Sequence, residues 1–92
     1  MSPNSDAAWA YRGFIARKEG NWILALENYK SALSINPNNI LARSYFGQGL
    51  ALRGEITLAE EQLAEIRARG GAGTWAEKAL IEALKTGVAT DY

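Results

Sequence analysis

The stretch ALENYKSALSINPNN, residues 25–39, decides the fold of this chain. Its apolar side chains recur at helical spacing and form one broad stripe, made of Ala25, Leu26, Tyr29, Ala32 and Leu33. The end of that helix is marked by Asn36 and Pro37, because proline disfavours the α conformation in the residue before it and asparagine suits turns. Trp22 extends the stripe backwards, so a helix is predicted over about residues 22–35.

An internal repeat surrounds this stretch. When the sequence is displaced by 34 residues, most landmark positions keep their character. The aligned pairs are Ala8 and Ala42, Gly13 and Gly47, Gly20 and Gly54, Ala25 and Ala59, Tyr29 and Leu63, and Ala32 and Ile66. A period near 34 residues is typical of helical repeat proteins, in which each unit is a pair of helices.

Helical spacing and stop signals predict four more helices, over about residues 6–19, 40–53, 57–69 and 74–85. Ser5 or Asp6 is expected to cap the first of them, and a glycine is expected to end each of the four. Thr74 and Glu77 have the spacing of a capping box at the start of the last helix. No segment alternates apolar and polar residues as a strand does.

The composition of the chain excludes several classes of function. The chain has 92 residues, ten basic and ten acidic side chains, and no cysteine or histidine. Zero net charge argues against nucleic-acid binding, and the missing residue types exclude disulfides, thiol nucleophiles and Cys/His zinc sites. No stretch is long and apolar enough for membrane insertion, and residues 1–6 lack the layout of a signal peptide. We therefore expect a soluble, non-enzymatic chain without a cofactor, cytoplasmic by default, or periplasmic if it is a fragment of an exported protein.

The first repeat resembles the tetratricopeptide repeat family. The residues that carry the resemblance are Trp9, Gly13, Gly20, Ala25, Tyr29, Ala32 and Pro37. The resemblance implies an all-α fold of five helices, with antiparallel helix-turn-helix repeats stacked as a short right-handed solenoid. One domain over residues 1–92 would hold repeat one at about 6–39, repeat two at about 40–71 and a capping helix at about 74–86.

The second repeat departs from this pattern. Arg43 stands where Trp9 does, and Gly71 stands where Pro37 does. The first repeat also begins almost at once and is apolar on two sides, whereas terminal repeats usually carry a polar outer face. The early start and the second apolar side of the first helix predict that the chain is the C-terminal piece of a longer protein.

The resemblance further implies that the first helix of each pair lines an inner surface that binds a segment of another protein. The candidate contact residues are Tyr11, Phe14, Arg17, Lys18, Leu41, Tyr45, Gln48 and Leu52. Two alternatives stay open: these side chains are core between repeats, which is favoured for Ile15 and Leu41, or the same surface joins copies of the chain into a homodimer or larger assembly. Some family members grip a chaperone's C-terminal carboxylate with basic and amide side chains. The corresponding surface here carries Ala10, Phe14 and Tyr45, which argues against that role.

Two other motifs have simpler readings. The segment Gly70–Thr74 before a helix could suggest a phosphate-binding loop, but no lysine follows and no strand precedes it, so it is read as a helix end and a linker. Several glutamates, Glu55, Glu60, Glu61 and Glu65, gather near the fourth helix, and they are read as a solvated face. The sequence contains no recognisable arrangement of a nucleophile, a general base or metal ligands, so we do not predict an enzyme.

Overall fold

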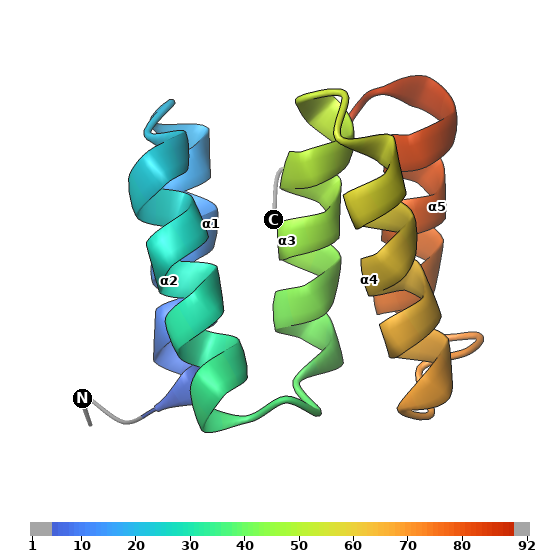
Figure 1. The fold of residues 1–92 in the computed structure, drawn as a ribbon, viewed down its shortest axis with the longest axis horizontal. Coiled ribbons are helices and arrows are strands. Elements are labelled where there is room, and N and C mark those ends of the chain that lie inside the picture. Colours follow the sequence, from blue (N-terminus) through green and yellow to red (C-terminus); the bar gives the residue numbers. More distant parts are fainter. Residues whose placement is uncertain (1–4, 90–92) are drawn as a thin grey trace.

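The computed structural model describes residues 5–89 and contains five α-helices (Figure 1). They are α1 (Asp6–Lys18), α2 (Trp22–Ile35), α3 (Ile40–Leu52), α4 (Ile56–Ala68) and α5 (Trp75–Thr86). No strand occurs within residues 5–89. The predicted all-α fold is therefore confirmed, and each predicted helix boundary lies within one residue of the observed one.

The helices form two antiparallel hairpins, α1–α2 and α3–α4, followed by α5 (Figure 1). The central helix is α3, which packs against each of the other four helices. Within residues 5–89, the backbones of α2 and α4 do not approach each other, so α3 forms the link between the hairpins. This arrangement is a short solenoid of stacked helical repeats, as expected when single hairpins cannot bury their apolar faces alone.

Local sequence explains most helix ends. Side-chain oxygens of Ser5, Asn21 and Asn39 accept hydrogen bonds from the third backbone N–H after them, which caps α1, α2 and α3. At the other ends of α1, α3 and α4, Gly20, Gly54 and Gly70 adopt φ values of 82°, 79° and 85°. These left-handed conformations favour glycine, which has no Cβ to clash.

The start of α5 differs from the predicted capping box. The Thr74 hydroxyl donates to the Gly71 carbonyl at 2.6 Å and caps no backbone N–H. The Glu77 carboxylate accepts from the Gly73 N–H at 2.9 Å and from Arg67 Nε at 2.6 Å. The predicted reciprocal pair is therefore wrong, because Glu77 reaches one residue further back and joins α5 to α4.

Two glycines matched by the 34-residue offset allow close helix packing against different neighbours. A Cβ on Gly13 would lie 2.6 Å from the ring of Tyr29, which belongs to the same hairpin. A Cβ on Gly47 would lie 2.7 Å from Leu80 of α5. Gly13 therefore brings α1 onto α2, whereas Gly47 brings α3 onto α5.

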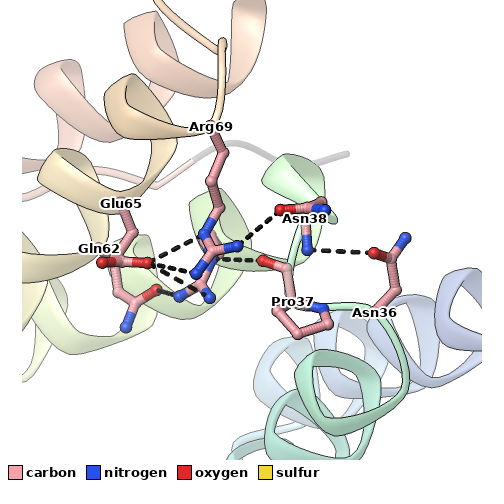
Figure 2. Close-up of polar contacts among 7 residues, drawn as sticks. Asn36, Pro37, Asn38, Gln62, Glu65 and Arg69 are labelled. Carbon is pink, nitrogen blue, oxygen red and sulfur yellow. Dashed lines mark hydrogen bonds and ion pairs between the residues drawn. The ribbon is translucent and has the colours of Figure 1, made fainter.

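A polar network at the turn between the hairpins holds them together (Figure 2). Arg43 is buried, with only 8% of its surface exposed. It donates from Nε to the Pro37 carbonyl at 2.9 Å and from Nη1 to Gln62 Oε1 at 3.0 Å. Arg69 donates from Nη1 to Asn38 Oδ1 at 2.6 Å and pairs with Glu65 at 2.8 Å. The turn at residues 37–38 is thereby attached to α4, which lies beyond α3.

Candidate functional site

Four aromatic rings form a continuous row across α1, α3 and α5, which we call the aromatic row. It consists of Tyr11 and Phe14 on α1, Tyr45 on α3 and Trp75 on α5. Successive ring centroids are 6.3 Å, 5.0 Å and 5.9 Å apart, and the last pair meets edge to face. These separations are those of favourable aromatic pairs. The row therefore crosses the first helix of both hairpins and ends on α5.

The two ends of the row are open to solvent and its centre is more deeply placed. Tyr11 is 61% exposed and Trp75 is 38% exposed, whereas Phe14 is buried and Tyr45 is half-buried. Aromatic clusters that remain exposed are common at protein interfaces, because large rigid rings bury much area at low entropic cost. The row offers two accessible rings supported by two packed ones.

The charge around the row is basic. The Arg17 guanidinium lies 5.4 Å from the centroid of Phe14, which is within the range of a cation–π contact. Lys18 is exposed in the last turn of α1, and α3 has no acidic residue. Burial raises the pKa of Tyr45, with Arg17 acting in the opposite direction. Near neutral pH the row therefore consists of uncharged rings with cations at the end of α1.

Tyr29 of α2 supports this surface from the core. Its side chain is completely buried between Gly13 and Phe46, whose ring centroid lies 5.8 Å away. Burial raises the pKa of its phenol to about 12, and Arg17 partly opposes that shift. Tyr29 is therefore a neutral core residue that fixes the spacing of α1 and α3 beneath the row.

The structure brings together three of the candidate contact residues predicted from sequence, Tyr11, Phe14 and Tyr45. Arg17 contacts this group, and Lys18 is one residue further along α1. Leu52 is exposed and lines a hollow with Trp22, Arg53 and Arg17, and it has no ring contact with the row.

Two expectations about burial are corrected. The sequence favours Ile15 and Leu41 as core residues, but they are 38% and 43% exposed. The reason is that the hairpins meet through small residues, Ala10, Ala32 and Ala42, which leaves larger neighbours outside. Gln48 is completely buried and donates from Nε2 to Ser44 Oγ at 3.0 Å, so its side chain is not accessible on this surface.

Trp75 is the residue of the row that sequence reasoning did not select, because it was assigned to the packing stripe of the last helix. A signal for it exists in the repeat. A further displacement by 34 residues aligns Trp75 with Leu41 and Ala76 with Ala42. The closing helix thus keeps the register of the first helix of a repeat, and its exposed position falls beside Tyr45.

Within residues 5–89, no group of three or more acidic side chains is placed to hold a metal ion. In the same part of the chain, no helix combines the length and the apolar character needed to cross a membrane.

Comparison with known families agrees with the architecture. The model of the tetratricopeptide repeat family matches residues 6–39, which hold α1, α2 and the following turn. Comparison with curated proteins and with solved structures gave no match. Tetratricopeptide repeats generally mediate protein–protein interaction and form non-catalytic scaffolds. The match over residues 6–39, together with the five stacked helices, supports a protein of the tetratricopeptide repeat type.

Proposed function

We propose that this chain is a protein-interaction scaffold without catalytic activity, and that its aromatic row binds an apolar segment of a partner protein. The observation that carries the proposal is the unbroken contact from Tyr11 through Phe14 and Tyr45 to Trp75. A packed core does not need rings that stay 61% and 38% exposed at its two ends. A partner that covers them gains the hydrophobic free energy that the isolated chain leaves unused.

The neighbouring side chains support the same proposal. Leu41 adds a 43% exposed apolar group on α3, four residues before Tyr45 and therefore on the same face of that helix. Lys18 and Arg17 lie at the C-terminal end of α1, where they also complement the helix dipole. The surface combines a buried aromatic centre, exposed anchors and a charged edge, the usual composition of a binding patch.

A photo-crosslinking experiment tests the proposal. The photoreactive residue p-benzoylphenylalanine is placed at Tyr11 or at Leu41, and the crosslinked protein is identified after illumination of cells that express the chain. Both positions are exposed, so the fold should tolerate the replacement. We expect a common partner from both sites, and its purified form should bind the original chain in calorimetry.

Ile23 is the matched control, because it is 73% exposed on α2 and lies outside the row. The purified partner should lose about tenfold or more in affinity with Tyr11→Glu, since a few large aromatic side chains carry most of the binding free energy of an interface, and should bind Ile23→Glu unchanged. A partner that crosslinks equally at Ile23, or that binds Tyr11→Glu normally, contradicts the assignment of the row.

Self-association is the second candidate function, and one observation favours it. A hollow of about 330 Å³ lies on the α1–α2 hairpin beside the exposed Ile15 and Leu24, and its rim carries Arg12 and Glu19, one charge of each sign. A surface with both charges can pair with its own copy. Light scattering over a wide concentration range tests this candidate: a dimer that Leu24→Glu dissociates would support it, and a monomer throughout would reject it.

A further inference from the structure

A second apolar surface lies on the other side of α3. It is a hollow of about 380 Å³, formed by α2, α3 and α4. Phe46 and Leu50 of α3 line it together with Trp22 and Leu26 of α2 and Leu58 of α4. The aromatic row uses Tyr45, the preceding residue on α3, together with α1 and α5. The two surfaces are therefore separate.

The hollow is shaped by the packing of the helices around it. Within residues 5–89, the backbones of α2 and α4 do not approach each other, which leaves a groove between them over α3. Trp22 packs directly on the backbone of Gly49, where an added Cβ would collide with the indole ring. Gly49 therefore fixes Trp22 as a rigid wall, which reduces the entropy lost on binding.

Charge at the rim specifies the chemistry of an occupant. Lys30 and Arg53 line the hollow with one acidic residue, Glu55. The Arg53 guanidinium is held 5.2 Å from the centroid of Trp22. Within residues 5–89, neither cation forms an ion pair. Arg53 is thus a positioned cation with its N–H donors available to a carboxylate.

Size sets a further limit. A volume of 380 Å³ lies near the lower end of the roughly 300–1,000 Å³ range of ligand pockets. A whole helix, about 10 Å across with its side chains, does not fit inside. One or two large apolar side chains do, while the backbone that carries them stays at the rim near the cations.

We propose that this hollow binds a segment of a partner protein that inserts a leucine or phenylalanine side chain and places an aspartate or glutamate, within one helical turn of it, against Arg53 and Lys30. The apolar side chain is covered by Trp22, Phe46 and Leu58. The carboxylate selects the segment, since an uncharged segment leaves the positioned guanidinium without an acceptor. This surface does not depend on the aromatic row.

Peptide selection tests the proposal directly. A phage-displayed library of random twelve-residue peptides is selected on the full chain and depleted on the Leu58→Glu variant. Leu58 is 45% exposed, so the substitution should leave the helical circular dichroism unchanged. We expect the surviving peptides to share a leucine or phenylalanine with an acidic residue within four positions.

Synthetic forms of the selected peptides are then measured by calorimetry. Arg53→Gln should weaken their binding about tenfold, a typical effect for one partner of a close charge pair, and Tyr11→Glu should leave it unchanged. The proposal is overturned if the selected peptides lack acidic residues, if Arg53→Gln binds them equally well, or if Tyr11→Glu abolishes binding. It is also overturned if light scattering shows that Leu58→Glu dissociates a dimer, because the occupant is then a second copy of the chain.

Discussion

The two hairpins place different chemistry at equivalent positions. In α1–α2, Trp9 packs beside a cluster of buried alanines, Ala10, Ala32 and Ala42. In α3–α4, Arg43 occupies the position of Trp9 and is almost as buried as the core, but it makes hydrogen bonds to Pro37 and Gln62. Residues 6–39, which match the tetratricopeptide repeat model, form the hairpin that carries Trp9 at this position. One helical frame therefore tolerates either a packed ring or a paired cation.

The second position of contrast is Tyr29 and its counterpart Leu63. Tyr29 is completely buried and supports α1, α2 and α3, whereas Leu63 is half-buried at the edge of a cluster with Ile66 and Leu80. The first hairpin depends on one large ring, and the second divides the same task among aliphatic side chains and α5. Substitutions should therefore affect the two hairpins unequally.

The largest expected effect is that of Tyr29→Ala. Removal of a fully buried aromatic ring should lower the free energy of unfolding by about 3–5 kcal/mol, as for large-to-small core changes. The equivalent Leu63→Ala should cost clearly less, because Leu63 is half-buried. Urea unfolding followed by circular dichroism measures both, and equal losses would remove the contrast between the hairpins.

Alkaline pH should destabilise the fold through ionisation of the Tyr29 phenol. The phenol of Tyr29 has a pKa of about 12 in the folded chain, against an ordinary value of 10.0. Because the folded state binds this proton more tightly, the stability is full below pH 10 and is lost as pH rises through 12. The loss reaches about 2.7 kcal/mol, from 1.36 kcal/mol per pKa unit.

Tyr29→Phe provides the control for this titration. Within residues 5–89 the buried hydroxyl of Tyr29 has no hydrogen-bond partner of good geometry, so its removal should cost little at pH 7. The variant should then lose less stability than the original chain between pH 10 and pH 12, as measured by urea unfolding. The same alkaline loss in both chains would place the titrating group elsewhere.

Gly13→Ala and Gly47→Ala form a matched pair at one repeat position. The new methyl on residue 13 meets the Tyr29 ring, which cannot bend, and overpacking of this kind costs about 1–3 kcal/mol. The new methyl on residue 47 meets the ends of the flexible Leu80 side chain, so a smaller loss is expected. Thermal unfolding compares them, and a greater loss for Gly47→Ala would show that the α3–α5 contact is the tighter one.

Arg43→Met tests whether the buried, hydrogen-bonded arginine can be replaced by an apolar side chain. The change removes the hydrogen bonds to Pro37 and Gln62 and leaves the Pro37 carbonyl without that donor. A net loss of about 1–2 kcal/mol is expected from hydrogen bonds of a charged group, offset by apolar burial. Arg69→Met, at an exposed part of the same network, should cost less; an increase in stability for Arg43→Met would show that the cation is not needed for folding.

Acid should lower the stability of the fold slightly, by protonating two hydrogen-bonded carboxylates, Asp6 of α1 and Glu77 of α5. Hydrogen bonds from Asn36 and Asn39 lower the pKa of Asp6 below 3.8, and the bond from Arg67 lowers the pKa of Glu77 below 4.5. Both groups favour the folded state above these values, and that contribution is lost as pH falls below them. NMR titration of the two carboxylates measures the effect, and ordinary pKa values in both would contradict these connections.

Sequence alone was enough for the helices. The 34-residue period, the apolar stripes and the stops at Gly20, Pro37 and Gly54 are local signals, because each depends on residues within one or two turns. Sequence also allowed Tyr11, Phe14 and Tyr45 of the aromatic row to be predicted, since helical spacing assigns each of them to a face of its helix.

Tertiary structure decided how those faces are used. The burial of Gln48, the exposure of Ile15 and Leu41 and the contact of Trp75 with Tyr45 depend on how close α3 lies to its neighbours. That distance follows from side chains far apart in sequence, such as Gly47 and Leu80, and helical periodicity does not report which two faces meet. The hydrogen-bonded role of Arg43 belongs to the same class, because its acceptors lie in the preceding turn and on α4.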